Sequence, residues 1–279
     1  MPKSPIRNSY MFGEQKQDSY RYGLLDKELR PTTELGLARL KLPPEPHILE
    51  LGCGIGELAC FFAKELFPKG YVTAVDRARD IIRIGADKAA KEGIKNIGFV
   101  CVDAIEFDYG TNRYDMVHAR LTLIYLKDRK KVMQKIFQGL KPGGVVFVEE
   151  ILAIRKISQS DWPYEQMRDW CNKLTRAGGG NPDYTREELP RHLKELGFED
   201  INTYEEPVSY NSVRLIEQFG LLLKEIARAL QDQEIATRDQ IDEVYGKFMR
   251  ADPEELSIEF QIAQVIATKP SAASHQQQN

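Results

Sequence analysis

Short apolar runs alternate with stretches of helical periodicity through the middle of the chain. The apolar runs occupy 48–51, 72–76, 99–103, 114–118 and 145–150. After Gly56 and again after Asp128, apolar residues instead recur at helical spacing, which predicts helices with one buried face. A run that is apolar at every position is typical of a strand buried on both sides. The alternation therefore predicts an α/β fold, a mostly parallel sheet of right-handed βαβ units with helices on both faces.

The flanking segments predict further helices and two more strands. Leucines at helical spacing between 24 and 40 are interrupted by Pro31, so we expect a pair of lead-in helices. Thr185 and Glu188 have capping-box spacing ahead of a helix that ends at Gly197. Apolar stripes predict helices around 167–174, 215–230 and 241–248, and apolar runs predict strands at 198–204 and 258–268.

We expect the chain to divide into four parts. These are an N-terminal helical lead-in or lid at 1–45, a cofactor-binding core at 46–155, the remainder of the sheet with substrate-covering helices at 156–268, and a disordered tail at 269–279. The tail is rich in Ser, Ala and Gln, a composition with too little apolar surface to form a core.

The first apolar run leads directly into closely spaced glycines. Gly52, Gly54 and Gly56 follow Glu50 and come just before a predicted helix. Glycine suits a backbone that turns sharply or lies against a ligand, and the start of a helix points unpaired N–H groups at the same place. A dinucleotide fingerprint has its third glycine one position later. The loop, preceded by a carboxylate, fits a ligand with a cationic end better than one with a pyrophosphate.

Acidic residues end the next two apolar runs. Asp76 is placed to accept hydrogen bonds from both hydroxyls of a ribose; the alternative, which could coexist with this role, is that it caps a helix that begins at Ala78. Asp103, followed by Ala104, is a second candidate ligand contact, with a solvated loop carboxylate as the alternative.

Composition and charge narrow the possible partners. The chain has 279 residues, enough for one large domain or two small ones, and its 42% apolar content is ample for a buried core. Lys and Arg number 39 against 42 for Asp and Glu, a net charge of −3 without a long basic run, so we expect no nucleic-acid and no membrane partner. Four cysteines without CxxC pairing predict reduced thiols, and the lack of a signal core or an apolar span of about 20 residues predicts a cytoplasmic protein. No His or Cys spacing indicates a metal site.

On its glycine loop and strand ends, the chain resembles the class I S-adenosylmethionine-dependent methyltransferases, most closely over residues 45 to 155. The resemblance implies a Rossmann-like seven-stranded sheet whose last strand is antiparallel, with S-adenosyl-L-methionine as the cofactor. It also implies that Asp103 and Ala104 contact the adenine. The cofactor-binding residues expected on this basis are Glu50, Gly52, Cys53, Gly54, Gly56, Asp76, Arg77, Asp103, Ala104 and His118.

Two strand ends carry candidate catalytic groups. His118 ends the fourth run, where open α/β sheets bind ligands, and could take a proton from a hydroxyl or an amine; a structural role is the alternative. Glu149 and Glu150 end the fifth run, and Glu150 is the rival base or substrate anchor unless both merely cap the strand beside solvent. Candidates for substrate contact or a lid are Tyr20, Tyr22, Arg120, Trp162 and Trp170, although aromatic residues at helical spacing belong more often to a core.

These features predict transfer of a methyl group to a small-molecule metabolite, with the acceptor atom undecided among oxygen, nitrogen and carbon. The alternatives are a non-methylating reaction on the same fold, such as cyclisation, an NAD-dependent oxidoreductase, and a non-catalytic binding module. The helices predicted at about 210–252 favour an enclosed pocket, or else a surface for a homodimer.

Overall fold

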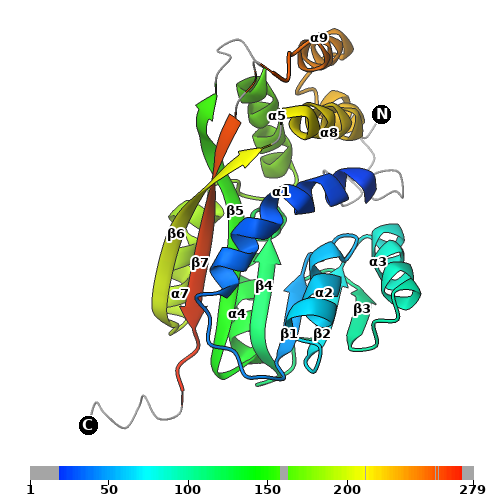
Figure 1. Ribbon diagram of the computed structural model, residues 1–279. Helices are drawn as coiled ribbons and strands as arrows, with labels where there is room; N and C mark the ends of the chain where they lie inside the picture. Colours follow the sequence, from blue (N-terminus) through cyan, green and yellow to red (C-terminus); the bar gives the residue numbers. More distant parts are fainter. Residues whose placement is uncertain (1–18, 158–162, 211, 255, 257, 272–279) are drawn as a thin grey trace, which may run out of the picture.

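The computed structural model describes residues 19–157, 163–210, 212–254, 256 and 258–271. Within this range, seven strands form one sheet with helices on both faces (Figure 1). The strands are β1 (His47–Leu51), β2 (Tyr71–Asp76), β3 (Ile97–Cys101), β4 (Tyr114–Arg120), β5 (Leu140–Ile157), β6 (Glu199–Tyr210) and β7 (Ile258–Thr268). The helices are α1 (Ser19–Leu37), α2 (Glu57–Phe61), the π-helix η2 (Phe62–Leu66), α3 (Arg79–Lys91), the 3-10 turn η3 (Leu123–Tyr125), α4 (Arg129–Gly139), α5 (Tyr164–Ala177), α6 (Tyr184–Glu187), α7 (Leu189–Glu195), α8 (Ser212–Asp232) and α9 (Arg238–Met249).

The strand order is β3-β2-β1-β4-β5-β7-β6. β1 to β5 pair in parallel, whereas β7 is antiparallel to both β5 and β6, so the predicted mostly parallel seven-stranded sheet is confirmed. The chain moves outward in one direction from β1 to β3 and then returns to β4 on the other side of β1. Open α/β sheets bind ligands at such a switch point, beyond the carboxyl ends of the two central strands.

The core is divided among several apolar clusters. Phe62 and the other buried residues of α2, η2 and α3 cover one face, and residues of α4, α6 and α7 such as Tyr184 cover the other. A third cluster joins α5, α8 and α9 to the ends of β6 and β7. Figure 1 shows β5, β6 and β7 extending past the other strands toward these helices. The prediction that the fifth strand ends at Glu150 was wrong, because β5 continues to Ile157 and pairs there with β7.

Two helix predictions were also wrong in detail. The segment with Pro31 forms one continuous helix, α1. Pro31 is exposed and removes one backbone hydrogen bond, while Leu24, Leu29 and Thr33 bury the opposite face of the helix against the protein. The segment after Thr185 is instead broken into α6 and α7, with Thr185 inside α6 and not at a cap.

Candidate cofactor site

The glycine loop joins β1 to α2 with three residues in the left-handed region. The φ angles of Gly52, Gly54 and Gly56 are 72°, 52° and 73°. A Cβ atom on Gly52 would overlap the Thr122 side chain, whereas one on Gly54 would have only Tyr22 near it, at 4.0 Å. Glycine is therefore required at 52 by packing, and at 54 it leaves a hollow open.

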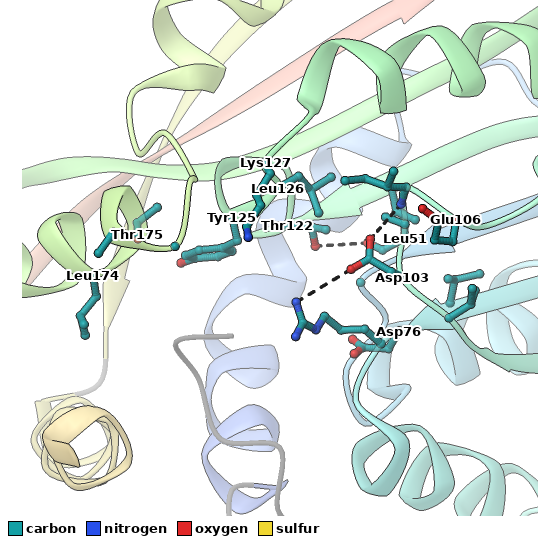
Figure 2. Close-up of a pocket in the computed structure, with 18 residues that line it drawn as sticks. Leu51, Asp76, Asp103, Glu106, Thr122, Tyr125, Leu126, Lys127, Leu174 and Thr175 are labelled. Carbon is teal, nitrogen blue, oxygen red and sulfur yellow. Dashed lines mark hydrogen bonds and ion pairs between the residues drawn. The ribbon is translucent and has the colours of Figure 1, made fainter. Parts of the chain in front are cut away.

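Two cavities meet at this loop, and Figure 2 shows the residues that line the larger one. The larger, of about 360 Å³, lies beyond the carboxyl ends of β1, β2 and β3 and is also lined by the loop after β4 and the end of α5. The smaller, of about 90 Å³, lies between the glycine loop, α1 and the end of β4. Gly52, Asp76 and Thr122 line both cavities, so the two form one elongated site.

Asp76 organises the centre of this site. Its Oδ2 accepts a hydrogen bond from the Gly54 N–H at 3.0 Å, and its Oδ1 accepts one from the Ala78 N–H at 2.9 Å. Burial raises the pKa of Asp76, although both backbone hydrogen bonds oppose this shift. The alternative role as a helix cap is not what the structure shows, since α3 begins at Arg79 with Ala78 as its N-cap.

Asp103 lines the larger cavity. Its Oδ1 accepts a hydrogen bond from the Ile105 N–H at 2.9 Å, and its Oδ2 lies 3.9 Å from Nη1 of Arg77 (Figure 2). Both side chains are about one third exposed, so this ion pair is screened by water and contributes little to stability.

The structure brings most of the predicted cofactor residues to the two cavities. Those that line a cavity are Glu50, Gly52, Cys53, Gly54, Asp76, Arg77, Asp103 and Ala104. Gly56 does not line either one; a Cβ atom there would lie 2.8 Å from the Phe99 ring, so this glycine permits close packing of α2 on its neighbours.

The structure does not place the two candidate catalytic residues at these cavities. His118 has no exposed surface, and its ring nitrogens contact Glu50 and Glu149 at 2.8 and 3.0 Å. Glu150 is 2% exposed, and its Oε2 has no hydrogen-bond partner in the described part of the chain. Burial raises the pKa of Glu150 well above its ordinary value, although the Ile151 N–H opposes the shift. The hypothesis that both glutamates cap a strand beside solvent was wrong, because both are buried.

The structure places only some of the candidate substrate and lid residues at a cavity. Tyr22 and Arg120 line the smaller cavity. Tyr20 is 57% exposed and lines neither cavity, while Trp170 is 4% exposed inside the α5–α8–α9 cluster, as the core alternative expected. Trp162 lies outside the described residues.

Sequence reasoning missed several wall residues. Asp26 follows Tyr22 by one helical turn on α1 and lines the smaller cavity beside it; that spacing is the signal that could have found it. Tyr125 on η3 and Thr175 on α5 line the larger cavity, and no motif marks either of them.

A metal-binding group and a membrane-spanning helix were both sought among the described residues. No group of His, Cys, Asp and Glu side chains there could hold a metal ion. Among the described helices, none combines the length and apolarity that crossing a membrane requires.

The family follows from a match that covers the glycine loop and the strand ends of the site. Residues 44–206, more than half of the chain, match the model of a family described as a methyltransferase domain. The chain belongs to the methyltransferase-domain family. Its membership agrees with the resemblance that the glycine loop and strand ends suggested.

Similar curated proteins match only part of this methyltransferase-domain chain. Demethylmenaquinone methyltransferase of Listeria monocytogenes is 26% identical over 98 residues, which are 35% of this chain and 41% of that protein. The ubiquinone/menaquinone biosynthesis C-methyltransferase UbiE of Vibrio cholerae is 32% identical over 108 residues, 38% of this chain and 42% of that protein. The chain thus spans about two fifths of the length of these relatives.

Solved structures share the fold over a greater length. The [4+2]-cyclase SpnF has a TM-score of 0.56 and 23% identity, covering 87% of this chain and 82% of that one. Phosphoethanolamine N-methyltransferase 2 of Haemonchus contortus, solved with S-adenosylhomocysteine, has a TM-score of 0.52 and 20% identity, covering 91% of this chain and 53% of that one. At these identities the likeness concerns the fold.

Proposed function

We propose that this protein is an S-adenosylmethionine-dependent methyltransferase that acts on a small-molecule acceptor. The observation that carries the proposal is the elongated site, in which two cavities join at Gly52 and Asp76. The hollow beside Gly54, which a Cβ atom would begin to fill, fits a ligand that lies against the loop backbone.

We assign one end of the ligand to each cavity. In the larger cavity, Asp76 is proposed to accept hydrogen bonds from the ribose hydroxyls, and Asp103 with Ala104 to contact the adenine, with Arg77 beside them. The smaller cavity is lined by four acids and by Arg120; the acid of α1 is already paired with Arg120 and Arg30, and the acid of α2 with Lys88, so Glu50 is the carboxylate proposed to receive the positively charged end of the ligand. These acids are Asp26, Glu50, Glu57 and Asp76.

Methyl transfer requires the alignment of donor and acceptor and the exclusion of water more than it requires a strong base. S-adenosylmethionine, when bound, supplies a methyl group on a positively charged sulfur. The residues of this chain would hold donor and acceptor in line and exclude water, and such positioning can supply much of a rate enhancement. Tyr22 and Asp26 of α1 line the wall of the smaller cavity and would take part in that enclosure.

The acceptor is proposed to lie under α1 and the helices of 156–268. Among the described helices, α5, α8 and α9 lie near the carboxyl ends of β4 and β5, with α1 beside them (Figure 1). An enclosed region favours a metabolite over a protein tail or an RNA. The relatives named as menaquinone or ubiquinone methyltransferases match too little of the chain for their acceptors to be assigned to it.

Isothermal titration of the protein with S-adenosylmethionine and with NAD tests the proposal. Saturable binding of the sulfonium compound alone is the expected result, and binding of NAD alone would overturn the proposal. Mass balance on the cofactor then separates methyl transfer from a non-methylating reaction of the kind that the cyclase neighbour's name describes, since only methyl transfer releases S-adenosylhomocysteine.

A further inference from the structure

A buried histidine lies between two glutamates at the centre of the sheet. Nδ1 of His118 is 2.8 Å from Oε2 of Glu50 on β1, and Nε2 is 3.0 Å from Oε2 of Glu149 on β5. The side chains are 0%, 3% and 1% exposed. The rings of Phe62 and Phe147 pack against the imidazole in T-shaped arrangements, with ring centroids 5.5 and 4.9 Å away. Because an ionised carboxylate can only accept, this geometry fits an imidazolium that donates from both nitrogens.

The charges around His118 support the same protonation state. Burial disfavours the charged ring, but Glu50 and Glu149 outweigh it and raise the pKa of His118 to about 9. Burial likewise raises the pKa of Glu149, yet hydrogen bonds and charge from His118, together with Arg120, bring that pKa below its usual value. Arg120 is paired in turn with Asp26.

The hydrogen bonds continue from this group into α1. Oγ1 of Thr33 donates to Oε2 of Glu149 at 2.6 Å, and Gln264 on β7 donates to Oε1 of Glu149 at 2.9 Å. Arg120 donates to Oγ1 of Thr33 at 3.2 Å and to Oδ1 of Asp26 at 2.6 Å. This hydrogen-bonded network therefore connects Glu50 to Arg120 and Asp26, and all three of these residues line the smaller cavity.

We propose that His118 is a positioning residue for the cofactor site. It fixes one carboxylate oxygen of Glu50 and leaves the side chain turned to the smaller cavity, where Glu50 receives the ammonium group at the amino-acid end of the cofactor. This inference rests on the proposed function. It differs from a catalytic role, because His118 touches neither cavity and acts through Glu50.

The test compares two ligands that differ only at that end. S-adenosylhomocysteine carries the ammonium and carboxylate, whereas 5′-methylthioadenosine has the same adenosyl group without them. We expect His118→Gln to weaken S-adenosylhomocysteine binding about 10- to 100-fold, the range for a lost hydrogen bond to a charged group, and to leave methylthioadenosine binding within about twofold. The matched control is His192→Gln, since His192 on α7 is also buried, contacts Tyr184 at 3.2 Å and lines neither cavity.

Each outcome has a definite meaning. A merely structural role would lower the affinity for both ligands equally or for neither, and either result would overturn the inference. Failure of the wild type to bind S-adenosylhomocysteine would instead refute the proposed function itself.

A measurement on the wild type tests the positioning role of His118 even if His118→Gln does not fold. Nitrogen-15 NMR of the His118 ring should show both nitrogens protonated at pH 7.5, with titration near pH 9, and a shift on adding S-adenosylhomocysteine but not methylthioadenosine. A neutral ring at pH 7.5, or equal responses to the two ligands, would contradict the inference.

Discussion

Substituting alanine at Gly52 and at Gly54 should separate the folding role of the glycine loop from its binding role. Both residues have positive φ, so each variant meets the strain of a left-handed conformation, about 1–2 kcal/mol. Only Gly52→Ala also pushes a Cβ atom into Thr122. Overpacking costs about 1–3 kcal/mol. Thr122 Oγ1 lies 2.9 Å from the Arg120 carbonyl, and moving it sacrifices about 1 kcal/mol of hydrogen bonding.

Summing these contributions, Gly52→Ala should lower the free energy of unfolding by about 3–6 kcal/mol and Gly54→Ala by about 1–2 kcal/mol. Urea denaturation followed by circular dichroism measures both. Calorimetric titration should then show that folded Gly54→Ala binds S-adenosylmethionine at least about tenfold more weakly, because its methyl group occupies the hollow of the smaller cavity.

Gly93→Ala is the matched control for both variants. Gly93 has φ of 70°, an added Cβ atom would meet nothing within 4 Å, and the residue lies past the end of α3 away from both cavities. If Gly52→Ala were no less stable than Gly93→Ala, the packing argument would be refuted. If Gly54→Ala bound the ligand as tightly as Gly93→Ala, the hollow would not be part of the binding site.

Three further variants test other parts of the structure. Asp76→Asn turns one carboxylate oxygen into a donor that faces a backbone N–H, so we expect a loss of about 1–3 kcal/mol in unfolding free energy and no calorimetric binding of methylthioadenosine. Glu150→Leu removes a buried unpartnered oxygen and should raise stability. Because the pKa of Glu150 is raised in the folded protein, the wild type loses stability as pH rises above about 4.5. Urea denaturation should therefore show that Glu150→Leu increases the free energy of unfolding more at pH 8 than at pH 5. An equal increase at the two pH values would contradict this. Arg21→Met should cost about 3–5 kcal/mol by breaking the buried ion pair in which Nε of Arg21 lies 2.6 Å from Oε2 of Glu225, and Glu225→Met in the same chain should restore part of this loss in thermal unfolding.

The centre of the sheet was predictable because β1, β2 and β4 are short apolar runs that are buried on both faces. The left-handed glycines and the acids at the ends of β2 and beyond β3 are likewise local features, and the structure brings Gly54, Asp76 and Asp103 to one site. The continuity of α1 through Pro31 was not predictable in this way, because a proline weakens a helix locally while the burial that maintains it involves β-strands and α8 far along the chain.

The strand ends show most clearly where sequence patterns stop being informative. His118 pairs in register with Glu50 on β1 and with Phe147 on β5, and this register directs Glu149 to the same face as the imidazole. Glu50 and Glu149 are 68 and 31 residues away from His118, and shifting either pairing by one residue would turn the side chain to the opposite face. A polar residue at a strand end therefore indicates that a site is near, but only the register decides whether that residue touches the ligand or supports, from beneath, another residue that does.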